Sequence, residues 1–214
     1  GEGKHILGAA VIGSGVTVND ISVNIPTAES PSGIFTPISC PLTTNAGVQT
    51  LLALPAAPAL NGTFPLDTGK VNATAVNQVV ASPESNLAFI TYTADTANTN
   101  AYLPYYVPGT NGAAGTVGYV PLTGGSTIIA PLAGAFTPDD SLFFVSTAGD
   151  NMIHFISVPL ATNPATAATA DTQQISPKLP PCTPSTDAGC TLPSTSTGPY
   201  VPATAIAVKP RSTT

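Results

Sequence analysis

The sequence repeats one ten-residue pattern, first at residues 82–91 (SPESNLAFIT) and again at residues 137–146 (TPDDSLFFVS). Each copy contains a hydroxyl residue, a proline, a short acidic or polar stretch, and then a run of apolar and aromatic residues. A recurring pattern of this kind is typical of repeat architectures, in which each unit is one small supersecondary structure. The repeat therefore constrains the fold more than any single residue does, and it indicates a scaffold rather than a particular reaction.

The composition favours short strands joined by turns. The chain has 214 residues, of which 43% are hydrophobic and only 7% are charged, compared with roughly 25% charged residues in an average soluble domain. Its 23 prolines and 19 glycines are frequent turn formers and interrupt long helices. We therefore expect an all-β chain with a buried core.

The charge pattern disfavours two classes of partner. The net charge is −6, and no lysine or arginine occurs between Lys70 and Lys178. Nucleic acids and anionic membrane surfaces require clustered cations, so neither is an expected partner. The longest apolar segment, residues 48–60, is interrupted by Pro55 and Pro58 and is too short to span a bilayer. We expect no membrane insertion.

Antiparallel hairpins are expected around both copies of the repeat. Residues 86–93 and 115–122 are expected to form two strands of one sheet, separated by a long insertion at residues 96–114. Residues 142–147 and 152–160 should pair across the turn at 148–151, because its Gly-Asp-Asn sequence tolerates positive φ. Further strands are expected at residues 16–25, with a phase shift at Asn19-Asp20, and at residues 201–209.

A second recurring element divides the chain into units. An apolar residue, proline and leucine are expected to close an apolar strand at residues 64–66, 120–122 and 158–160. Each is followed downstream by a proline after a hydroxyl residue, at Pro83, Pro138 and Pro177. We accordingly divide the chain into an N-terminal β segment (1–60), a region of repeated sheets (61–180) and a Pro/Thr-rich tail (181–214).

Residues 137–158 resemble a blade of the YVTN-type β-propeller family. The shared pattern is a Ser-Pro-Asp-Gly-like start, an aromatic and valine-containing strand, a Gly-Asp-Asn turn and a second apolar strand. Residues 79–93 are similar to the start of the same blade. The resemblance covers about half the chain and implies antiparallel four-stranded blade-like sheets. Two units are clear, whereas a closed propeller has at least about four blades, so the propeller is expected to be incomplete or completed by neighbouring subunits.

The cysteines favour an oxidising location. Cys182 and Cys190 enclose a Pro/Gly-rich loop with little apolar content, for which a disulfide is the expected staple. Cys40 is left over, either as a small buried residue or as a partner in an intermolecular bridge. Together with the low charge, this favours an extracellular or cell-surface protein. Asn61 and Asn72 begin matches to the N-glycosylation pattern, which matter only if the source makes that modification.

Reactive groups are few, and we expect no catalytic residues, no metal and no cofactor. His154 should face opposite to Ile153 and Phe155 in its strand and is interpreted as a surface histidine or one with satisfied hydrogen bonds. Asp139 and Asp140 are interpreted as turn residues, with calcium ligation as the alternative. Some propeller relatives are lactonases, but the acidic, arginine and histidine groups that such activity uses cannot be matched to this chain, whose single arginine is Arg211.

Three tyrosines form the candidate contact surface. Tyr102, Tyr105 and Tyr106 lie with two prolines in the insertion, and an exposed Tyr/Pro patch suits carbohydrate, surface proteins or another subunit. The alternative is that these residues fold back into a small core of their own.

These observations favour a non-enzymatic extracellular structural or interaction protein that assembles with other copies of itself. Low charge makes close packing between subunits easier, and a terminal strand could add to the sheet edge of a neighbour. The alternatives are a ligand-binding propeller fragment of a longer secreted protein and, in third place, a lactonase-like enzyme.

Overall fold

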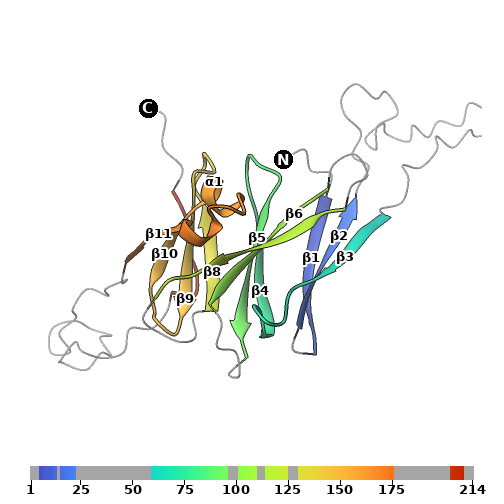
Figure 1. The fold of residues 1–214 in the computed structure, drawn as a ribbon, viewed down its shortest axis with the longest axis horizontal. Helices are drawn as coiled ribbons and strands as arrows, with labels where there is room; N and C mark the ends of the chain where they lie inside the picture. Colours follow the sequence, from blue (N-terminus) through green and yellow to red (C-terminus); the bar gives the residue numbers. More distant parts are fainter. Residues whose placement is uncertain are drawn as a thin grey trace, which may run out of the picture.

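The strands form three antiparallel sheets that stand in a row (Figure 1). The structure is a computed structural model that describes residues 5–13, 15–22, 59–95, 101–109, 114–124, 130–175 and 203–209. The first sheet has the order β1-β2-β3, formed by β1 (His5–Ile12), β2 (Gly15–Ser22) and β3 (Ala59–Pro65). The prediction of a mostly antiparallel β protein is confirmed.

The other two sheets have four strands each and follow the chain in order. The middle sheet contains β4 (Ala73–Ala81), β5 (Ala88–Ala94), β6 (Tyr102–Val107) and β7 (Thr116–Pro121). The third sheet contains β8 (Ala130–Phe136), β9 (Leu142–Ala148), β10 (Ile153–Ser157) and β11 (Asp171–Ile175), with α1 (Val158–Ala161) and the 3₁₀ turn η1 (Ala167–Thr169) between its last two strands.

The sequence repeat marks the same turn in both four-stranded sheets, between the first strand and the second. The Ser82 amide donates to the Leu87 carbonyl at 2.8 Å, and the Thr137 amide donates to the Leu142 carbonyl at 2.9 Å. Asp140 occupies the left-handed region, with φ of 54°, as Asp tolerates in turns. The two copies of the repeat therefore have one structural role.

The middle sheet has a neighbouring sheet packed on each side, so that its second strand, β5, is buried on both faces. Phe89 contributes to the core shared with the third sheet, whereas Ile90 and Tyr92 contribute to the core shared with the first. Successive residues of a strand point to opposite faces, which explains why five consecutive residues of β5, from Ala88 to Tyr92, are buried.

Aromatic rings fill the core between the middle and third sheets. The Phe89 ring stacks on Phe143 with centroids 4.5 Å apart and also contacts Phe136 at 5.6 Å and Tyr105 at 5.9 Å. Tyr105 lies across Gly118 of the next strand, where a Cβ atom would come within 2.0 Å of the tyrosine ring. A glycine opposite Tyr105 therefore provides the space that this ring occupies.

Three strand predictions need correction. The insertion at 96–114 contains β6, which pairs with both β5 and β7, because its alternating apolar residues pack into the two cores. The strand expected at 152–160 ends at Ser157, where the backbone turns into α1 with Pro159 in its first turn, a position that proline favours. Residues 203–209 form no strand, although one was expected. Pro177 lies outside the described residues.

The phase shift predicted at Asn19-Asp20 is confirmed only as an irregularity on one side of β2, because the alternation of buried side chains continues to Asp20. β2 pairs with β1 without interruption, and the irregularity between Asp20 and Ile21 concerns its pairing with β3. Asp20 thus follows Val16 and Val18 on the buried face and is 1% exposed. The predicted domain boundary at 60/61 falls within β3, which pairs with β2.

Candidate functional site

The predicted tyrosine surface is divided between the two faces of the middle sheet. Tyr106 is fully buried against the first sheet, Tyr105 is 7% exposed against the third, and Tyr102 is half-buried. The idea of one exposed patch therefore needs correction for Tyr106, because alternation in β6 turns its ring into a core.

Tyr102 and Tyr105 line a groove of ≈ 850 Å³ that runs along β6 and β7 to the α1–η1 connection. Tyr119 lies edge-on to Tyr102 with ring centroids 6.3 Å apart, and Lys70 Nζ lies 4.5 Å from the centre of the Tyr119 ring. Asp140 also lines the groove. Aromatic rings with hydroxyl, ammonium and carboxylate groups nearby can bind a polar ligand that has apolar faces.

Two tyrosine hydroxyls that line the groove, those of Tyr105 and Tyr119, have raised pKa values. Burial raises the pKa of Tyr105, and burial also raises the pKa of Tyr119, whose hydroxyl accepts a hydrogen bond of 2.6 Å from the Asp67 amide. Neither histidine nor cysteine is among the described residues that line the groove.

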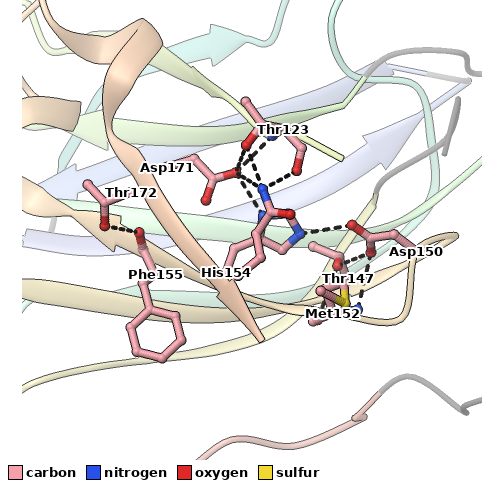
Figure 2. A network of polar contacts seen from close by, with 9 residues as sticks. Thr123, Thr147, Asp150, Met152, His154, Phe155, Asp171 and Thr172 are labelled. Atoms are coloured by element: carbon pink, nitrogen blue, oxygen red, sulfur yellow. Dashed lines mark hydrogen bonds and ion pairs between the residues drawn. The ribbon is translucent and has the colours of Figure 1, made fainter. Parts of the chain in front are cut away.

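His154 lies at the centre of a buried polar network (Figure 2). Its Nδ1 is 2.8 Å from Asp171 Oδ2, and its Nε2 is 3.0 Å from Asp150 Oδ2. Burial alone would lower the pKa of His154, but the hydrogen bonds to Asp150 and Asp171 outweigh burial and raise it to about 9. The ring is therefore charged at neutral pH and donates from both nitrogens. Of the two interpretations of His154, a surface histidine or one with satisfied hydrogen bonds, the second is confirmed.

The network joins the third sheet to the loop that follows the middle sheet. Asp171 Oδ2 also accepts hydrogen bonds of 2.8 Å from the amide and the hydroxyl of Thr123, while Asp150 accepts one from the Thr147 hydroxyl (Figure 2). Burial would raise the pKa of both aspartates, but hydrogen bonds, led by those from His154, lower it. His154 itself is 0% exposed, so the network is positioned to stabilise the fold rather than to meet a substrate.

A second carboxylate links the first sheet to the middle sheet. Asp20 accepts a hydrogen bond of 2.7 Å from the Tyr106 hydroxyl through one oxygen, and its other oxygen is 2.8 Å from His5 Nδ1. Burial, followed by the hydrogen bond with Asp20 and its charge, raises the pKa of Tyr106. Neither buried carboxylate network is predicted from the sequence. The one available signal was a lone histidine in an apolar strand, four residues after a turn aspartate.

Asp139 and Asp140 are turn residues, as predicted. Asp139 accepts a hydrogen bond from the Ser141 hydroxyl at 2.8 Å, and hydrogen bonds with Thr137 and Ser141 lower the pKa of Asp139 to about 2. Asp140 accepts from the Ser82 hydroxyl and, at 3.1 Å, from the Glu84 amide. The turns of the two sequence repeats therefore contact each other directly.

Several other predictions can be placed on the chain. Among the residues that the structure describes, no group of three or more His, Cys, Asp or Glu side chains could hold a metal ion, and no helix is long and apolar enough to cross a membrane. Cys40, Cys182, Cys190 and Arg211 lie outside the described residues. Asn72 precedes β4 and is half-buried, whereas only the backbone of Asn61 is described.

Comparison with known proteins identifies no relative. No family model, no curated protein and no solved structure matches the chain.

Proposed function

We propose that this chain is a non-enzymatic extracellular structural or interaction protein, built from propeller-type sheets, that assembles with other copies of itself. The observation that carries the proposal is the row of sheets in which the first strand of each four-stranded sheet packs against the preceding sheet. The low charge and the expected Cys182–Cys190 disulfide favour the extracellular location.

The packing of the strands supports a propeller-type arrangement. β8, the first strand of the third sheet, packs against both β4 and β5 of the middle sheet. β4, the first strand of the middle sheet, packs in turn against β1. First strands that gather on one side of face-to-face antiparallel sheets are typical of propeller blades around an axis. The equivalent turns at residues 82–87 and 137–142 add to this support.

Exposed apolar residues on the first sheet support self-association. Ile6, Ile21 and Leu60 face each other in register across β1, β2 and β3, and Ile6 and Leu60 are 52% and 61% exposed. Ile12, at the end of β1, is 70% exposed. Contiguous exposed apolar side chains commonly mark interaction surfaces, and a second copy with equally few charges can cover them without burying ions.

The groove beside Tyr102 and Tyr119 supports the second candidate, a ligand-binding propeller fragment. Its rings and hydroxyls suit a carbohydrate or a polar segment of a surface protein. The lactonase-like alternative has less support, because His154 is enclosed by carboxylates and His5 is hydrogen-bonded to Asp20.

Multi-angle light scattering across a concentration series tests the proposal. We expect the average mass to rise above the 21.3 kDa of one chain as the concentration increases. A single mass of one chain at every concentration would contradict self-assembly. In that case, binding to a glycan panel that is lost in Tyr119→Ala would support the ligand-binding alternative, and turnover of a lactone panel would support the enzyme.

A further inference from the structure

The first sheet corresponds to the last three strands of a four-stranded sheet. The Leu66 amide donates to the Val16 carbonyl at 2.8 Å after β3, and the Leu122 amide donates to the Ala101 carbonyl at 2.8 Å after β7. Both leucines follow the same apolar-proline element. β3 thus matches β7, and β2 matches β6.

By the same correspondence, β1 matches β5, the second strand of the middle sheet. β5 packs against β8 of the following sheet, as β1 packs against β4 of the following sheet. β5, however, pairs with β4 on its other side, whereas β1 is the edge strand of its sheet. Among the described residues, no strand occupies the place beside β1 that β4 and β8 occupy in their sheets.

Residues 203–209 have the sequence of such a first strand. Ala-Thr-Ala-Ile at 203–206 matches Ala-Thr-Ala-Val at 73–76, the start of β4. A valine and then a proline follow in each case. Val208 and Pro210 follow residues 203–206, and Val80 and Pro83 follow residues 73–76. Residues 203–209 do not match the ten-residue repeat at 82–91 and 137–146, because they correspond to the strand that precedes the turn formed by that repeat.

Within its own chain the segment belongs to none of the described sheets. Residues 203–209 form no strand, and Ile206 and Val208 are half-buried while Ala205, Ala207 and Lys209 are exposed. This alternation is the pattern of a strand with one buried face. In Figure 1 the segment, drawn in red, appears at the end of the row that holds the third sheet, opposite to β1.

The number of sheets indicates that the partner is a second copy. With residues 203–209 as a twelfth strand beside the eleven described strands, each copy supplies the strands of three four-stranded sheets. For the described residues, closure within one chain would give a ring of three sheets, fewer than the roughly four to eight blades of propellers. Two copies would give six sheets, within that range.

We propose that residues 203–209 of one copy pair with the open edge of β1 in a second copy, and that two such reciprocal exchanges close a ring of six sheets. The inference rests on the proposed self-assembly and names its contact. An edge strand presents unpaired backbone groups that accept an added strand. The added strand runs antiparallel to β1, as β4 runs antiparallel to β5, and it turns Ile206 and Val208 toward the core.

The first test changes the segment in the full-length chain. Ile206→Asp with Val208→Asp is expected to weaken dimerisation by roughly a hundredfold or more, because charges would enter the face that must be buried. The matched control, Ala205→Asp with Ala207→Asp, changes the exposed alternate positions and is expected to weaken it far less. Sedimentation equilibrium gives both dissociation constants.

The second test leaves every native residue in place. A second copy of the sequence of residues 203–209, joined ahead of Gly1 by a short Gly/Ser linker, would reach β1 of its own chain at a millimolar effective concentration. This variant is expected to be monomeric, and the same extension carrying both aspartates is expected to remain dimeric. If neither test lowers the mass while the unmodified chain still associates, the inference is wrong and self-assembly stands. If the unmodified chain is monomeric throughout, both are wrong.

Discussion

Replacing His154 by leucine is expected to lower the free energy of unfolding by about 3–5 kcal/mol. The variant removes the charged group between two carboxylates whose side chains are 0% and 8% exposed, those of Asp171 and Asp150. Asp171 would keep its hydrogen bonds with Thr123 but lose its counter-charge. Urea unfolding followed by circular dichroism measures the change.

Two controls distinguish loss of this network from general damage to the sheet. Gln173→Leu places the same side chain on the exposed side of β11 and is expected to change stability by no more than about 0.5 kcal/mol. The second control is pH. Because the pKa of His154 is raised from 6.5 to about 9, its stabilisation is complete below pH 6.5 and is lost as the pH rises through 9.

The wild-type free energy of unfolding should therefore fall across this pH range by up to about 1.4 kcal/mol per pH unit, and the fall should be absent in His154→Leu. The lowered pKa values of Asp150 and Asp171 affect stability only at acidic pH, since the stabilisation that these carboxylates provide is lost only as the pH falls below their ordinary pKa of 3.8. Equal pH slopes in the two proteins, or a loss of less than about 1 kcal/mol, would contradict a charged His154.

Phe89→Ala is expected to cost about 3–5 kcal/mol of unfolding free energy, because it removes a fully buried ring in contact with three others. Phe144→Ala is the matched control, since Phe144 occupies the position of Phe89 in the second sequence repeat. Phe144 is half-buried and contacts Phe155 at 4.8 Å, so its loss should cost only about 1–2 kcal/mol. Similar losses in the two variants, measured by urea unfolding, would contradict the packing of the sheets.

Phe89 and Phe144 also show how far the sequence predicts the fold. The repeat correctly indicates that the two residues lie at equivalent places in two sheets. It does not indicate that Phe89 is enclosed by a following sheet, because burial depends on what packs on the outer face. The strand β6 was missed for a related reason, since Pro104 and the surrounding tyrosines resemble a loop until both faces of the sheet are known to be buried.

The polar sites were less predictable than the strands. His154 could be interpreted as satisfied from its place in an apolar strand, and Asp150 is four residues away across a predicted hairpin. Asp171, 17 residues beyond His154, and Thr123, in another sheet's loop, have no local pattern that connects them to it. The buried position of Asp20 was not predicted, because a carboxylate on the same strand face as Val16 and Val18 suggests an irregular strand. The group that makes its burial possible is the Tyr106 hydroxyl, which donates a hydrogen bond from 86 residues away.

Hydrogen exchange measured at increasing protein concentration tests the central claim most directly, because it reports the two proposed contact segments in the unmodified chain. We predict that amides of residues 6–12 and of residues 203–209 gain protection together as the chain associates, while those of β10, already paired on both sides, do not change. Association without added protection in either segment would contradict the proposed completion of the first sheet by a second copy.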